Sequence, residues 1–148
     1  MGQQQLLLVI LVTIIIGVAT IVAINVLNSQ SVEANRNAVR QDMTAAASFV
    51  QSLWERPNLF GGANRQFTRL EEEKILEYLN VPSSNYQVGD TEATNDNGTY
   101  RVVIVNDSEL RIIGEPSTGP PNFQLTVLRN NDTGNWEFEF ADAAEENE

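Results

Sequence analysis

Residues 6–27 read LLLVILVTIIIGVATIVAINVL, and this stretch decides the fold class of the 148-residue chain. It carries no charged side chain, and 16 of its 22 residues are Leu, Ile or Val. A helix of this length can cross the roughly 30 Å hydrocarbon core of a membrane. The stretch therefore predicts a membrane-spanning helix within a hydrophobic N-terminal region, residues 1–30.

A cleaved secretory signal is the first alternative for this region. Such a signal has a basic start, a shorter apolar core and a cleavage site with small residues on either side of one position. Here the core is preceded by Gln3, Gln4 and Gln5, and Ile21 stands where a small residue should precede Ala23. We therefore expect the apolar segment to stay in the protein.

The helix is expected to continue beyond the apolar stretch, because no Pro or Gly occurs from Ser31 to Trp54. Apolar residues recur in this part at alternating steps of four and three, which places them in one stripe on a helix. Pro57 ends the pattern, since proline disfavours the helical conformation of the residue before it. The stripe predicts an amphipathic continuation over residues 31–56 that packs on a sheet through Val39, Met43, Ala46, Val50 and Leu53.

The opposite face of this continuation is predicted to face solvent and to carry Arg36, Arg40, Asp42, Gln51 and Glu55. The same spacing is also that of a heptad seam, so a short coiled-coil stalk is the alternative. Only about two heptads of the pattern exist.

Residues 57–148 are predicted to form an acidic globular domain. Four segments have the composition of strands, and they form two hairpins, 99–105 with 109–115 and 122–129 with 135–140. A capping box from Thr68 to Glu71 predicts a short helix that reaches Leu79 and turns Leu70 and Ile75 inward.

In the last strand, Trp136, Phe138 and Phe140 alternate with glutamates, which predicts a half-buried strand. Residues 81–97 are expected to be irregular, and the end of the chain to be an acidic tail. The expected fold is α+β: a long N-terminal helix, apolar in its first half and amphipathic in its second, packed on about four antiparallel strands.

Composition argues against several classes of function. The net charge is −11, and 17 acidic against six basic residues follow Arg56, so we expect no nucleic-acid partner. The chain has no His and no Cys, which removes the usual general base and the thiolate nucleophile. The acids from Asp90 to Asp96 do not match the spacing of a calcium loop. We expect no enzyme activity, no metal and no cofactor.

The stretch IIIGVATIVAIN, from Ile14 to Asn25, resembles the AIIGILAAIAIP pattern of type IV pilins and of the pilin-like pseudopilins. Gly17 stands at the glycine of that pattern, and Asn25 stands where many members have proline. Met1-Gly2 resembles a very short leader that ends in glycine, so the resemblance implies possible processing between Gly2 and Gln3. The family's glutamate near the start of the mature helix is absent here, and three glutamines take its place.

The resemblance implies a structural subunit of an extracellular, pilus-like helical filament that polymerises through its hydrophobic N-terminal helix. Its partners would be further copies of itself, the inner membrane before assembly, and a pilus assembly machinery. The filament core would form from Gln3, Gln4, Gln5, Leu6, Leu11, Ile15, Gly17 and Asn25. Gln3 to Gln5 would set the register between subunits, and the helix would unwind locally between Gly17 and Asn25 within the filament.

Two alternatives remain open from the sequence. One is a single-pass, membrane-anchored binding module that never polymerises. The other is a pseudopilin of a secretion system, which differs from a pilin only in the length of the filament.

Overall fold

The computed structural model describes residues 2–83 and 85–143. The chain divides into two compact units, Met1–Ala34 and Asn35–Glu148. We call residues 2–34 the N-terminal segment and the second unit, from Asn35 onward, the head. Residues 35–56, which make up most of the predicted amphipathic continuation, belong to the same compact unit as the sheet.

The elements follow one another simply along the chain. Helix α1, Gly2–Glu55, includes residues of both units, and two short 3₁₀ turns, Asn58–Phe60 and Phe67–Arg69, follow it. Helix α2 comes next, and then the five strands. Their bounds are α2 Glu72–Tyr78, β1 Glu92–Thr94, β2 Gly98–Asn106, β3 Glu109–Pro116, β4 Phe123–Arg129 and β5 Trp136–Asp142.

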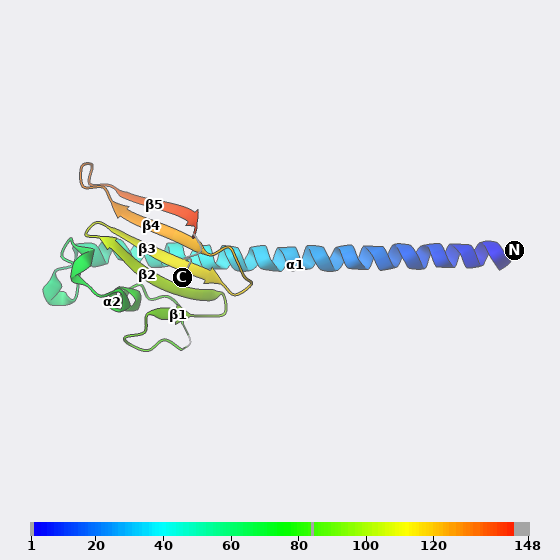
Figure 1. Cartoon of the computed structure of the whole chain (residues 1–148), viewed down its shortest axis with the longest axis horizontal. Helices are drawn as coiled ribbons and strands as arrows, with labels where there is room; N and C mark the ends of the chain where they lie inside the picture. The colour runs from blue at the N-terminus through cyan, green and yellow to red at the C-terminus, as the bar shows by residue number, and fades with distance from the viewer. Residues whose placement is uncertain (1, 84, 144–148) are drawn as a thin grey trace. The chain divides into compact units, whose positions relative to one another are not determined.

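The five strands form one antiparallel sheet in the order β1-β2-β3-β4-β5, so every strand lies beside its neighbour in sequence (Figure 1). Both predicted hairpins are confirmed, with β2 paired to β3 and β4 paired to β5. The expectation of about four strands is corrected to five. Strand β1 is only three residues long, and it lies within the stretch that was expected to be irregular.

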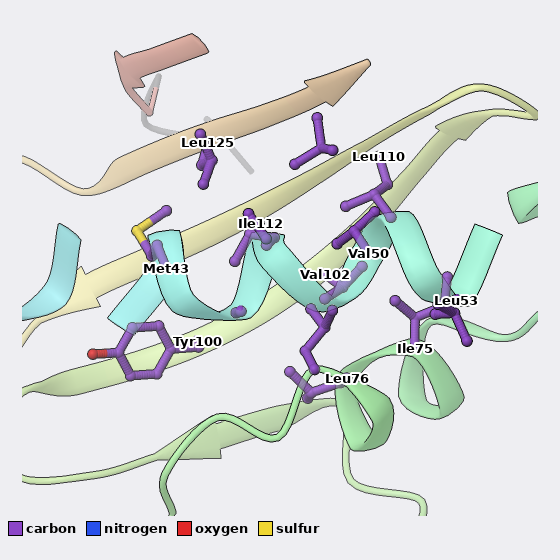
Figure 2. Close-up of a cluster of buried hydrophobic side chains, with 14 of the residues drawn as sticks. Met43, Val50, Leu53, Ile75, Leu76, Tyr100, Val102, Leu110, Ile112 and Leu125 are labelled. Atoms are coloured by element: carbon purple, nitrogen blue, oxygen red, sulfur yellow. The ribbon is translucent and has the colours of Figure 1, made fainter. Parts of the chain in front are cut away.

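The core of the head lies between one face of the sheet and the second half of α1 (Figure 2). Strand residues alternate between two faces, and the face toward α1 presents Tyr100, Val102, Leu110, Ile112 and Leu125, all buried. Helix α2 adds Ile75 and Leu76 to the same cluster. This arrangement confirms the predicted α+β fold with a long N-terminal helix packed on an antiparallel sheet.

The predicted capping box does not form. Thr68 lies in a 3₁₀ turn and its hydroxyl donates a hydrogen bond to the Asp107 carboxylate in the β2–β3 turn. Helix α2 begins only at Glu72, and Glu71 at its N-cap makes no side-chain capping bond. The Thr68 hydroxyl therefore bonds to the Asp107 carboxylate, and it does not cap the helix as the sequence pattern predicted. Leu70, Ile75 and Leu79 are buried, as predicted.

Strand β5 differs from the prediction in its burial. Phe138 and Phe140 pair with Val127 and Leu125, so they lie on the face that also bears the core. Their side chains nevertheless keep 46% and 43% of their surface exposed. A helix about 10–12 Å wide covers two or three strands spaced about 4.8 Å apart. Alternation predicted which way the aromatics of this strand point, but it could not show that the helix leaves β5 uncovered.

Candidate assembly surfaces

Residues 6–27 of the N-terminal segment present an uncharged, largely apolar surface on all sides. All its described residues are helical, and every side chain of the predicted filament core is exposed within the single chain. Leu6, Leu11 and Ile15 expose 64%, 53% and 57% of their surface. A helix that is apolar on every side requires lipid or protein around it. By its length and composition this helix could cross a membrane.

Three hydroxyl groups of this segment donate hydrogen bonds to the helix itself. The Thr13 hydroxyl donates to the Val9 carbonyl at 2.8 Å, and the Thr20 hydroxyl donates to the Ile16 carbonyl at the same distance. Ser29 makes the same bond to Asn25 at 3.0 Å. These donors therefore need no water, which suits an apolar environment.

Gly17 and Asn25 are both helical in the single chain. A Cβ atom at Gly17 would meet no atom outside its own helix within 4 Å. No contact within the chain therefore requires glycine at this position. The predicted unwinding from Gly17 to Asn25 concerns the filament and stays a prediction. The possible processing site begins at Gly2, the first described residue, and Gln3, Gln4 and Gln5 are helical and exposed.

The structure brings together all the residues that were expected to pack the helix on the sheet. Each is at most 2% exposed, and each belongs to the single core cluster of the head: Val39, Met43, Ala46, Val50 and Leu53. The helix passes close to the sheet at Gly114 of β3. A Cβ atom there would lie 2.6 Å from the Met43 sulfur and 2.9 Å from the Val39 Cγ1. Gly114 therefore permits the close packing of α1 on β3.

The prediction that Asp42 lies on the solvent face is wrong. Its Oδ2 accepts a hydrogen bond from the Tyr100 hydroxyl at 2.7 Å, and from the side-chain amides of Asn95 at 3.0 Å and Asn97 at 2.9 Å. Asp42 precedes Met43 and so lies at the edge of the apolar stripe rather than opposite it. The carboxylate ties the β1–β2 turn to α1.

Arg36 and Arg40 also differ from the prediction. Their guanidinium groups lie 5.1 Å and 4.5 Å from the centre of the Phe123 ring on β4. These are cation–π distances. Both arginine side chains therefore pack on Phe123 of the sheet instead of extending into solvent. No local pattern could indicate this contact, because Phe123 lies more than 80 residues away in the chain.

Asp107 in the β2–β3 turn is a second polar hub that the sequence analysis missed. Its carbonyl oxygen accepts from the Phe67 backbone N–H at 3.0 Å and from the Trp54 indole N–H at 3.2 Å. Its carboxylate accepts from Thr68 and from the Gln66 amide. The turn is thereby joined to the end of α1 and to the loop that follows.

Two tyrosine side chains of the head have a raised pKa. Burial and the Asp42 carboxylate raise the pKa of Tyr100, and burial with Glu77 raises that of Tyr86. Both shifts oppose formation of a phenolate nucleophile. Within residues 2–83 and 85–143, no group of three or more His, Cys, Asp or Glu side chains is placed to hold a metal ion.

Comparison of the chain with protein-family models, curated proteins and solved structures finds no match.

Proposed function

We propose that this protein is the structural subunit of an extracellular, pilus-like helical filament that polymerises through its hydrophobic N-terminal helix. The observation that carries the proposal is the exposed, uncharged and largely apolar run of residues 6–27 on a chain whose head has a core of its own. Lipid would cover the segment before assembly, and the helices of neighbouring copies would cover it afterwards.

The energy for such an assembly comes from burial. Moving apolar surface out of water contributes about 25 cal/mol per Å², and 16 large aliphatic side chains lie between Leu6 and Leu27. Since the segment leaves membrane lipid rather than water, close helix packing and release of lipid would supply the net stabilisation. Contacts between different faces of neighbouring copies propagate as an open helix instead of closing into a ring.

Two further features support the proposal. The apolar segment and the core stripe of the head belong to one helix in the secondary structure, α1, and no Gly or Pro occurs between residues 31 and 54. A tethered binding domain would more typically follow a flexible linker rich in Gly, Ser or Pro. The sequence IIIGVATIVAIN also resembles the pilin pattern within the same segment.

The test is electron microscopy of material sheared from the cell surface, combined with mass spectrometry of the purified fibres. The proposal expects fibres that contain this chain. The N-terminal peptide of the fibre, beginning at Met1 or at Gln3, would determine whether Gly2 ends a leader. Recovery of the chain only as a monomer from detergent-extracted membranes would favour the anchored binding module instead. Short fibres retained within the cell envelope would favour the pseudopilin.

A further inference from the structure

Three tripeptides of the head match the pattern Asn-x-Ser/Thr, in which x is any residue except proline. They are Asn97-Gly98-Thr99, Asn106-Asp107-Ser108 and Asn131-Asp132-Thr133. In a domain that lies outside the cytoplasm, this pattern marks asparagines that can accept an N-linked glycan. The pattern is the same at all three sites, but the folded head holds them differently.

The half-buried Asn97 is fixed by both its side chain and its main chain. Its Nδ2 donates to the Asp42 carboxylate at 2.9 Å. Its carbonyl oxygen accepts from the Asn35 side-chain amide at 2.8 Å and from the Ser117 N–H at 2.9 Å. Hydrogen bonds to ionised groups are stronger than those between neutral groups. The nitrogen that would take a sugar is therefore held against α1.

The other two residues of this tripeptide, Gly98 and Thr99, begin strand β2, which pairs with β1 on one side and with β3 on the other. Gly98 is buried, and a Cβ atom there would lie 2.1 Å from the Glu115 carbonyl oxygen. The Thr99 hydroxyl lies 3.1 Å from that of Thr94 on β1. A transferase could bind this tripeptide only after the strand left the sheet.

The second asparagine, Asn106, is exposed, but the residue after it is anchored. Asp107 accepts hydrogen bonds from four groups at the end of α1 and in the loop that follows it. The Asn106 Oδ1 also accepts from the Ser108 N–H at 2.9 Å, within the tripeptide. This site therefore cannot leave the surface of the head without breaking the bonds to Asp107.

The third asparagine, Asn131, lies in the turn at the end of the β4–β5 hairpin (Figure 1). All three residues of its tripeptide are exposed. Its Nδ2 donates to the Ser108 hydroxyl at 3.0 Å, which is a neutral partner. The turn is shaped by bonds within itself, from the Gly134 N–H to the Asn130 carbonyl at 2.8 Å and from the Thr133 N–H to the Asn130 Oδ1 at 3.1 Å. An enzyme can therefore bind this turn while the sheet keeps its pairing.

We propose that Asn131 is an N-glycosylation site and that the folded head protects Asn97 and Asn106. The Asn131 Nδ2 forms a bond to the anomeric carbon of a sugar, and the bond from that carbon to the phosphate of a glycosyl phosphate donor breaks. The phosphate leaves with the electron pair, and the amide nitrogen gives up one proton to a base of the transferase. Both the donor and the transferase come from the cell.

The proposal goes beyond the proposed function and rests on it in one respect, the position of the head outside the cytoplasm. An attached glycan is bulky and solvated. The β4–β5 turn therefore lies on the outer surface of the filament, where copies of the chain do not bury it.

The test is mass spectrometry of the full chain isolated from the cells that make it. Cleavage after Lys and Arg places the three asparagines in separate peptides, residues 75–101, 102–111 and 130–148. We expect the mass of a glycan on the 130–148 peptide of the wild-type chain and on neither of the other two. This measurement needs no variant, so it does not depend on how a variant folds.

Variants then assign the residue within that peptide. Asn131→Gln and Thr133→Ala should each remove the added mass. Thr133→Ser keeps a hydroxyl at the same position and should retain it. Asn106→Gln is the matched control, because it removes another exposed asparagine of the same pattern, and its 130–148 peptide should carry the glycan as in the wild-type chain.

The outcomes separate the glycan site from the filament. An unmodified 130–148 peptide from assembled fibres would overturn the site and leave the filament intact. A glycan on Asn97 or Asn106 in place of Asn131 would also overturn it. A chain that carries the glycan on Asn131 but forms no fibres of any length would support the site and contradict the filament.

Discussion

The hydroxyl of Tyr100 on β2 donates a 2.7 Å hydrogen bond to the Asp42 carboxylate on α1. Tyr100 is fully buried, and the bond joins the centre of the sheet to the helix that covers it. Asn95 and Asn97 add two further donors to the same oxygen. This small polar network complements the apolar packing of α1 on the sheet.

The Tyr100–Asp42 bond predicts a loss of stability at alkaline pH. Burial and Asp42 raise the pKa of Tyr100 above its ordinary value of 10.0, so the unfolded chain releases this proton at a lower pH than the folded chain does. The stability that protonated Tyr100 contributes is therefore fully present below pH 10 and is lost as the pH rises further. In that range the free energy of unfolding falls by about 1.4 kcal/mol per pH unit.

Tyr100→Phe tests this by thermal unfolding in mild detergent between pH 8 and pH 11. The variant should be less stable by about 1.5 kcal/mol at pH 8, because Asp42 loses one donor, and its stability should fall less steeply above pH 10. Tyr86→Phe is the comparison variant, because the half-buried Tyr86 donates to the Glu73 carbonyl and not to Asp42. An unchanged pH dependence in Tyr100→Phe would contradict the role assigned to this bond.

Substitutions at Thr68 and Glu71 distinguish the observed contact from the predicted capping box. Thr68→Val removes the donor to Asp107 and should lower the free energy of unfolding by about 1 kcal/mol. Glu71→Ala should change it by less than about 0.5 kcal/mol, because Glu71 makes no capping bond. Both variants are measured by urea unfolding. Equal losses of unfolding free energy in the two would support the predicted capping box instead.

Gly114→Ala should destabilise the head by about 1–3 kcal/mol through overpacking against Met43 and Val39. Met43→Ala in the same chain removes the nearer contact, so the two losses should be less than additive in a double-mutant cycle. Gly17→Ala is the control, since a Cβ there meets no atom outside its own helix. Additive losses would show that α1 does not approach β3 at this point.

The sequence predicted those parts of the fold that depend on local periodicity. Steps of four and three from Val39 to Leu53 predicted the buried stripe, and the turn residues around Asp107 and Gly134 predicted both hairpins. Positions that depend on distant partners were missed. Asp42 and Thr68 bind residues that are 58 and 39 positions away, and neither shows a local signal.

The exposure of the aromatic residues of β5 was also not predictable from local sequence patterns. Alternation predicted that Phe138 and Phe140 share a face, but their burial depends on the width of the helix that covers that face. Strand β1 was missed because it has only three residues, of which only Ala93 is buried. For the candidate assembly surfaces, composition identified the apolar run of residues 6–27.

The central claim is assembly through the N-terminal helix, and Leu11→Asp tests it most directly. A charge at this position costs about 2.5–3.5 kcal/mol in a membrane-spanning helix and has no partner in a core of packed apolar helices. Val88→Asp places the same charge on an exposed position of the head. The measurement is the fibre yield by electron microscopy of sheared material from cells that express each variant at equal levels, with membrane fractionation of the same cells. We predict that Val88→Asp forms fibres like the wild-type protein and that Leu11→Asp forms none while its head still unfolds cooperatively. Normal fibres from Leu11→Asp would contradict the proposed assembly through this helix.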